Sequence, residues 1–284
     1  MFKPARPDEG GSARERPNPR TLAGLAAGAL LALMSLAAPS ASAAADTPRG
    51  VPILVYHRFD PTVAGPTTVT VAAFEAQLDW LTAHNYQVVS LRSALAGLDG
   101  AAPRPQGPVA VITADDGHKS VYTVLFPLIR KARIPVTLFI YPSAISNASY
   151  ALTWPQLQEM QASGLVDVES HTYWHPNFKT ERRRRTATDY AAFVDDQLSR
   201  SKAVITKTLG APVDLLAWPY GIVDADLEAA AKRAGYADAF AYAGGPAAAG
   251  DDRLALPRIP VSDADRGQRF GTMLQTRTRK RLEP

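Results

Sequence analysis

Short apolar runs alternate with amphipathic segments from about residue 51 onward, a pattern typical of repeated βα units around a parallel sheet. The runs that predict strands lie at residues 51–56, 86–91, 109–113, 136–141, 165–170, 215–218 and 239–243, with a further candidate at 254–261. Apolar positions at helical spacing predict helices at residues 71–84, 120–132, 154–163, 189–209 and 224–234. About seven such units closing on themselves predict a single α/β domain, a distorted (β/α)7-type barrel.

Proline and glycine residues mark where several of these elements begin, bend or end. Pro127 lies inside the predicted helix 120–132 and has no backbone N–H to donate, so we expect a kink or a late helix start there. Gly164, Gly210 and Gly235 follow three of the other helices, and glycine readily adopts the left-handed conformation that ends a helix. These positions agree with the boundaries that the hydrophobic pattern predicts.

The N-terminal segment has the three parts of a secretory signal peptide. A basic, proline-rich lead ends at Arg20, an apolar run covers residues 22–38, and small residues at 41–43 form a cleavage site. We expect a signal peptide at 1–43, a linker at 44–50, the folded domain at 51–265 and a basic C-terminal tail at 266–284. The protein would then be exported to the periplasm or beyond the cell. The alternative is an uncleaved inner-membrane anchor, because the lead is long and the apolar run is near the lower limit for a membrane span.

The composition allows a sizeable core and excludes several classes of protein. The chain is 46% hydrophobic and 20% charged, as is ordinary for a globular protein. Lys and Arg together number 31 against 27 Asp and Glu, and this near-balance argues against a nucleic-acid partner. The absence of cysteine excludes thiolate metal sites and leaves Asp, Glu and His as ligands. The composition gives no indication of the oligomeric state.

Carboxylates and imidazoles follow two of the predicted strands. The strand at 109–113 runs into Thr113-Ala114-Asp115-Asp116-Gly117, and the strand at 165–170 runs into His171-Thr172-Tyr173-Trp174-His175. In a parallel barrel the loops after the strands carry the chemistry, so we expect these groups to meet. Two imidazoles and one carboxylate would hold a divalent metal with a position open for water, and the second carboxylate could act as a base. The combination predicts a metal-assisted hydrolase.

Each motif alone has an ordinary structural explanation. Asp and Gly suit tight turns, and two histidines in one loop can be surface residues. The spacing of His171 and His175 is that of a helical metal-binding pair, but Pro176 disfavours helix at His175. The two imidazoles must therefore converge from a strand end and the loop beyond it. No Glu lies between them, so the base must be Asp115 or Asp116.

Three motifs together resemble the polysaccharide deacetylases of the NodB-homology type, carbohydrate esterase family 4. Residues 113–117 resemble the family's T-F-D-D-G motif with Ala114 in place of Phe, and residues 171–175 match its H-[ST]-x-x-H motif. Residues 218–221, Trp-Pro-Tyr-Gly, match the latter part of its R-x-P-[YF]-G motif. The resemblance covers residues 51–261 and implies a metal-dependent deacetylase acting on a polysaccharide.

By position, the resemblance assigns a role to each matching residue. It implies that Asp115 is the general base and that Asp116, His171 and His175 bind a divalent metal, commonly zinc. Cobalt, nickel and iron suit the same ligands. It also implies that the backbone N–H of Tyr220 faces the oxyanion of the tetrahedral intermediate.

Aromatic side chains near the motifs are candidates for lining a sugar-binding groove. Trp174 and Trp218 belong to the second and third motifs, and Trp154 and Tyr173 lie near them in the sequence. The alternative for each of these aromatic residues is ordinary core packing.

The chain departs from the family pattern at two positions. The Arg that orients the base in the third motif is Ala217 here, and the late Leu-x-His motif is replaced by Leu256-Pro257-Arg258. His57, after the first predicted strand, is the natural substitute for the missing histidine as general acid. Deacetylases of poly-β-1,6-N-acetylglucosamine have such an early histidine, so the resemblance is closest to that branch.

The favoured substrate is therefore poly-β-1,6-N-acetylglucosamine of a bacterial exopolysaccharide. Peptidoglycan or chitin-type oligomers are the alternative within the same chemistry. A carbohydrate-binding pseudoenzyme and a small-molecule amidase are alternatives of other classes, because substrate choice lies in loops that the motifs do not define. Membrane contact is expected only if the leader remains uncleaved.

Overall fold

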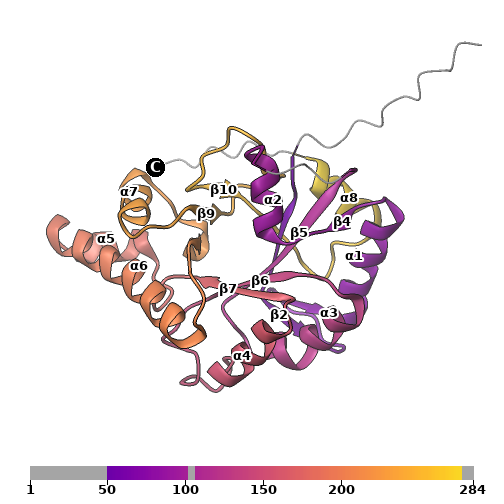
Figure 1. Cartoon of the computed structure of the whole chain (residues 1–284), viewed down its shortest axis with the longest axis horizontal. Coiled ribbons are helices and arrows are strands. Elements are labelled where there is room, and N and C mark those ends of the chain that lie inside the picture. The colour runs from indigo at the N-terminus through magenta and orange to yellow at the C-terminus, as the bar shows by residue number, and fades with distance from the viewer. Residues whose placement is uncertain (1–49, 102–105, 277–284) are drawn as a thin grey trace, which may run out of the picture. The chain divides into compact units, whose positions relative to one another are not determined.

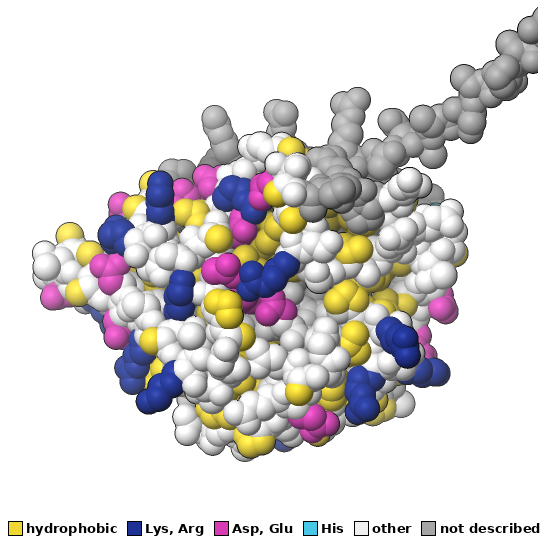
Figure 2. Space-filling view, viewed as in Figure 1, with side chains coloured by type: hydrophobic (Ala, Val, Ile, Leu, Met, Phe, Trp, Pro, Cys, Tyr) yellow, Lys and Arg dark blue, Asp and Glu magenta, His cyan; other side chains and the backbone are white. Residues whose placement is uncertain are grey.

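The computed structural model describes residues 50–101 and 106–276. The predicted signal peptide and most of the predicted linker lie outside these residues. Within the described part of the chain, no helix is long and apolar enough to cross a membrane. On the face seen in Figure 2, acidic and basic side chains are interspersed, so this face carries no broad surface of a single charge.

Parallel strands form one strongly curved sheet whose neighbours follow the order β10-β9-β8-β7-β6-β5-β1-β11. The strands are β1 (Ile53–Tyr56), β5 (Val109–Asp115), β6 (Val136–Ile140), β7 (Val166–Ser170), β8 (Leu215–Ala217), β9 (Asp238–Ala241), β10 (Leu256–Pro257) and β11 (Ile259–Pro260). Three further strands complete the set: β4 (Gln87–Val88) pairs with β5, and β2 (Arg58–Asp60) pairs with β3 (Thr68–Thr70).

The two ends of this sheet are joined by a single residue. β10 pairs with β9, β11 pairs with β1, and only Arg258 lies between β10 and β11. The segment thus changes partner at Arg258 and brings the first and last strands together. Counted as one interrupted strand, β10 and β11 complete a seven-strand barrel, which confirms the predicted distorted (β/α)7 fold.

Helices lie around the sheet in Figure 1, and one of them covers an end of the barrel. They are α1 (Val71–Ala83), α2 (Leu91–Leu98), α3 (Phe126–Ala132), α4 (Trp154–Ala162), α5 (Phe178–Arg184), α6 (Ala187–Leu209), α7 (Ala225–Arg233) and α8 (Gly267–Gln275), with short helical turns η1 (Val121–Leu125) and η2 (Pro219–Gly221). Leu91 and Leu95 of α2 pack in one cluster with Phe139 and Phe240 from inside the barrel. This helix therefore closes the barrel end opposite the strands' carboxyl ends.

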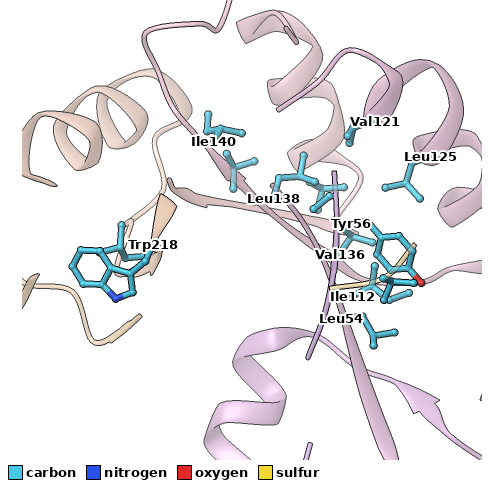
Figure 3. Packing of buried hydrophobic residues seen from close by; sticks show 14 of the residues in the cluster. Leu54, Tyr56, Ile112, Val121, Leu125, Val136, Leu138, Ile140 and Trp218 are labelled. Atoms are coloured by element: carbon cyan, nitrogen blue, oxygen red, sulfur yellow. The ribbon is translucent and has the colours of Figure 1, made fainter. Parts of the chain in front are cut away.

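Successive side chains of a strand point to opposite faces of the sheet, so one core lies inside the barrel and another lies between the sheet and the helices. Ile53 belongs to the inner cluster, whereas its neighbour Leu54 belongs to the outer cluster between sheet and helices. Figure 3 shows part of the outer cluster, which includes Leu54, Ile112 and Leu138 from the strands and Val121 from η1. The strands are consequently apolar on both faces, which explains the continuous apolar runs in the sequence.

Pro127 interrupts the predicted helix 120–132. The segment begins with the π-helical turn η1, and Pro127 is the second residue of α3, where its missing N–H costs little. The expected irregularity is therefore confirmed. The cause is physical, because a proline deeper in a continuous helix would remove a backbone hydrogen bond.

The prediction of a C-terminal tail beginning at residue 266 is wrong. Residues Gly267–Gln275 form α8, and Phe270 and Leu274 of this helix are fully buried in the outer core. The Phe270 ring lies 5.7 Å from the Trp80 ring of α1. Two apolar residues four positions apart are enough to anchor a short helix, and the folded domain therefore continues at least to residue 275.

Candidate metal centre

Three potential ligands from two strand ends come together at the carboxyl edge of the barrel. The Nε2 atoms of His171 and His175 lie 3.7 and 3.6 Å from Oδ1 of Asp116. One ligand atom from each residue lies within 4.8 Å of the other two, and this is the one such cluster found in the described part of the chain. The structure therefore brings together the three residues that the sequence predicted as metal ligands.

Unusual backbone conformations aim these side chains at one another. Asp116, Thr172 and His175 have φ values of 70°, 65° and 64°, in the left-handed region that side chains other than glycine rarely adopt. Each such residue costs of order 1–3 kcal/mol, and such costs cluster at functional sites. The turn after β5 and the loop after β7 are thus shaped for the side chains they present.

His171 has the hydrogen-bonding pattern of a metal ligand. Its side chain is fully buried, and its Nδ1 lies 2.7 Å from the carbonyl oxygen of Ala217. Because a carbonyl only accepts, Nδ1 must carry the hydrogen and Nε2 must carry the lone pair. Nε2 is buried without a hydrogen-bond partner among the described residues. A buried lone pair directed at a carboxylate and a second imidazole fits a divalent cation.

The environment keeps both imidazoles neutral. Burial lowers the pKa of His171 below its usual range, although Asp115 and Asp116 oppose this shift. Burial, with a further contribution from His171, lowers the pKa of His175 to about 4. Protons therefore do not compete for these nitrogen atoms near neutral pH, as metal binding requires.

We expect the metal-free protein to lose stability as the pH falls from about 6.5 towards 4. His175 takes up a proton more readily in the unfolded chain than in the folded one, so acid favours unfolding, by about 3 kcal/mol if its pKa is 4. Urea unfolding of the chelator-treated protein at several pH values measures this slope. The variant His175→Asn, which suits the left-handed backbone, should show a shallower slope, and an equal slope in both proteins would contradict the prediction.

Asp115 lies beside the cluster but is bound by other groups. It is fully buried, and its two oxygens accept hydrogen bonds of 2.9 and 2.7 Å from the guanidinium of Arg258. Burial alone would raise the pKa of Asp115, but the charge and hydrogen bonds of Arg258, together with His171, hold it well below its usual range. Asp115 is therefore an ionised carboxylate next to the candidate ligands.

Arg258 is a residue of the candidate site that the motif comparison missed. It is fully buried at the junction of β10 and β11, in the segment where the sequence comparison looked for a histidine. Its contact with Asp115 supplies the orienting guanidinium that Ala217 cannot. One signal was available in the sequence, because Arg258 is the single charged residue in the apolar segment 254–261. Charged residues in such segments are rarely buried without a partner.

His57 lies in the same site. It follows β1, and its Nε2 is 3.1 Å from the Tyr242 hydroxyl, which donates a 3.0 Å hydrogen bond to Asp115. The Tyr242 hydroxyl thus links the predicted acid, His57, to the predicted base, Asp115. Tyr242 was not predicted, and only its position after β9 could have indicated it.

Two aromatic residues of the second and third motifs are exposed. The Tyr220 side chain is 55% exposed, and its ring lies 4.6 Å from the His175 ring. Trp174 is 42% exposed and packs against Phe193. Both side chains are therefore accessible to a ligand.

Trp218 is fully buried, so its predicted contact with substrate is wrong. Its Nε1 donates a 2.8 Å hydrogen bond to the carbonyl of Leu254, and its ring packs against Phe178 of α5. Trp218 belongs to the buried cluster between sheet and helices, and Figure 3 shows it apart from the other labelled members. The Trp218 side chain is therefore part of the core, directly before the turn η2 that carries Tyr220.

Comparisons with known proteins agree with this site. The family model described as polysaccharide deacetylase matches residues 102–239, which include Asp115, Asp116, His171 and His175. The chain therefore contains a polysaccharide deacetylase domain of the NodB-homology, carbohydrate esterase family 4 type. Proteins of this class are enzymes that hydrolyse N-acetyl amides.

Two curated relatives of this chain have the same protein name. Poly-beta-1,6-N-acetyl-D-glucosamine N-deacetylase of Staphylococcus aureus strain MRSA252 is 25% identical over 69% of this chain and 68% of its own length. The protein of the same name from Staphylococcus epidermidis is 27% identical over the same shares.

Solved structures share the fold. IcaB from Ammonifex degensii has a TM-score of 0.70 and 24% identity, covering 80% of this chain and 98% of its own. Streptococcus pyogenes deacetylase PplD, solved in complex with acetate, has a TM-score of 0.70 and 22% identity, covering 81% and 100%. The family model does not extend to His57 or Arg258, so their roles depend on the geometry of this chain.

Proposed function

We propose that the protein removes acetyl groups from N-acetylglucosamine units of poly-β-1,6-N-acetylglucosamine in a metal-dependent hydrolysis. The names of the curated staphylococcal relatives support the substrate, and the Asp116, His171 and His175 cluster supports the metal dependence. Zinc suits two imidazoles and a carboxylate, as do cobalt, nickel and iron. The signal-peptide pattern supports export to the periplasm or beyond the cell.

Each polar group of the site has a part in this reaction. A divalent metal bound by Asp116, His171 and His175 would polarise the acetamide carbonyl and lower the pKa of water. Asp115 accepts the proton of the attacking water, since Arg258 keeps it ionised and fixed in position. The backbone N–H of Tyr220 is proposed to bind the developing oxyanion.

His57 is proposed to protonate the leaving amine when the C–N bond breaks. The acetyl carbon then retains the oxygen of water, and acetate and a free amine are the products. The proton taken by Asp115 and the proton lost by His57 balance over one cycle. His57→Ala should therefore lower kcat without removing metal, by a factor of about 10² to 10⁴.

Asp115 is the observation that carries the proposal. A protein that only binds carbohydrate has no need of a second carboxylate, buried, ionised and held by a guanidinium beside a complete ligand set. Such an arrangement costs desolvation energy, which a binding module could avoid. Hydrolysis uses this carboxylate as the base.

Aromatic rings next to the cluster, two of them exposed, support a polymeric substrate. The Tyr141 ring lies 5.4 Å from the His175 ring, and its hydroxyl is 2.9 Å from the hydroxyl of Tyr150, which is 41% exposed. The ring of Tyr220 lies 4.6 Å from the His175 ring. Such rings offer apolar faces to sugar units next to the reacting one.

We expect Tyr150→Ala to raise KM for long oligomers about three- to tenfold and to leave KM for a disaccharide unchanged. Tyr150→Phe, which keeps the ring, should resemble the wild type. Steady-state acetate release on oligomers of increasing length measures both effects. An equal change in KM at every chain length would remove Tyr150 from the proposed sugar surface.

Acetate release from defined oligomers tests the function itself. Wild type and Asp115→Asn are assayed on β-1,6-linked and β-1,4-linked N-acetylglucosamine oligomers, with metal content measured in both proteins. Turnover that is fastest on the β-1,6 series and lost in the variant supports the proposal. Faster turnover on β-1,4 oligomers would instead favour a chitin-type or peptidoglycan substrate. Bound metal without turnover on any oligomer would favour a carbohydrate-binding pseudoenzyme.

A further inference from the structure

The hydroxyl of Tyr242 lies between the proposed base, Asp115, and the proposed acid, His57. Tyr242 follows β9 directly, and its hydroxyl lies 3.0 Å from Oδ2 of Asp115 and 3.1 Å from Nε2 of His57. These two residues are 58 positions apart in the chain and come from different strands. One hydroxyl thus contacts both the proposed base and the proposed acid.

The ring of Tyr242 is fixed by close packing. A Cβ at Gly221 would lie 2.6 Å from the backbone nitrogen of Tyr242 and 2.8 Å from its Cβ, and Gly221 has a φ of 67°. Only glycine allows both this approach and this conformation. The guanidinium carbon of Arg258 lies 5.3 Å from the ring centroid. The hydroxyl therefore has little freedom to leave its two partners.

The Tyr242 hydroxyl has a single hydrogen, which fixes the direction of its hydrogen bonds to Asp115 and His57. The carboxylate of Asp115 only accepts, so the single hydrogen of the Tyr242 hydroxyl is donated to it. The hydroxyl can then only accept from His57, so Nε2 of His57 must carry a hydrogen. Nδ1 of His57 is the nitrogen that remains for proton exchange with a substrate amine.

We infer that Tyr242 is a positioning residue for deacetylation, which holds His57 in the Nε2–H form and at a fixed distance from Asp115. This role rests on the proposed function. Among the described residues, the hydrogen bonds of the Tyr242 hydroxyl involve Asp115 and His57 and none of the three candidate ligands. Its effect should therefore appear in the rate of the chemical step and hardly at all in metal or substrate binding.

Tyr242→Phe tests this role, because it removes the hydroxyl and keeps the ring that packs against Gly221. We expect kcat to fall about 10- to 100-fold, as for the loss of hydrogen bonds to charged groups, with KM changed less than twofold and metal content unchanged. Tyr122→Phe is the matched control. Its hydroxyl also donates to a carboxylate, that of Glu159, but on the exposed surface between η1 and α4. Its kcat should equal that of the wild type.

A double-mutant cycle and a spectroscopic measurement separate this role from a general loss of structure. In the His57→Ala background, Tyr242→Phe should cost less than in the wild type, because one of its two partners is absent. Nitrogen NMR of the His57 ring should show the Nε2–H tautomer in the wild type and a mixture of tautomers in Tyr242→Phe. Wild-type kcat in Tyr242→Phe, or an equal penalty in both backgrounds, would overturn the inference. If the wild type itself releases no acetate, the proposed function fails, and the NMR measurement still decides whether Tyr242 fixes His57.

Discussion

Asp116→Asn should lose bound metal and at least about 10³-fold in acetate release, because the metal supplies several kcal/mol of transition-state stabilisation. Asparagine tolerates the left-handed backbone at this position, where φ is 70°, so the turn after β5 should keep its shape. The substitution removes the only charge among the three candidate ligands. Two neutral imidazoles and an amide bind a divalent cation far more weakly than a site with a carboxylate.

Metal analysis and acetate release on the same samples check this expectation. The control is Asp196→Asn, an exposed carboxylate on α6, which should keep both metal and turnover. Treatment of the wild type with a chelator should reproduce the defect, and adding zinc should restore the wild type but not Asp116→Asn. Full turnover in a metal-free sample would exclude the proposed mechanism.

Arg258→Met should reduce both the stability and the activity of the protein. It leaves the carboxylate of Asp115 fully buried without its guanidinium, and breaking a buried ion pair in this way costs about 3–5 kcal/mol. The pKa of Asp115 should then rise, because burial raises it and Arg258 no longer opposes that shift. We expect turnover to fall at least about 100-fold, since the base loses both its charge and its orientation.

Urea unfolding and acetate release separate these two effects. The double variant Arg258→Met with Asp115→Asn carries no unpaired buried charge, so it should regain much of the lost stability but none of the activity. Arg258→Lys should lie between wild type and Arg258→Met, because an ammonium cannot bind both carboxylate oxygens as a guanidinium does. A double variant no more stable than Arg258→Met would show that Arg258 stabilises the barrel independently of Asp115.

The barrel and the cluster of candidate metal ligands could be predicted because they depend on local signals. The strands are continuous apolar runs, and the candidate ligands directly follow two of them, so the shared carboxyl edge of a parallel sheet brings Asp116 to His171 and His175. No side-chain contact had to be known. The left-handed turns that complete the geometry only refine this arrangement.

Contacts between distant segments were not predictable in the same way. Arg258 and Tyr242 are 143 and 127 positions from Asp115 in the sequence. Each directly follows a short strand, β10 of two residues and β9 of four, and no local pattern defines the register of these strands. The burial of Trp218 depends on α5, which the sequence did not predict. The helix α8 was missed because it has only a few apolar residues, and because its fit against Trp80 depends on the missing side chain of Gly271.

The proposed catalytic site is complete only after the C-terminal part of the chain, which carries Arg258, has folded. Asp115, Asp116 and both histidines are synthesised long before the residue that joins β10 to β11. A chain truncated before residue 256 would keep every candidate ligand yet lack the guanidinium that orients the base. The strands that close the barrel would be absent as well. The metal content of a preparation and its active fraction therefore depend on different parts of the chain and should be measured separately.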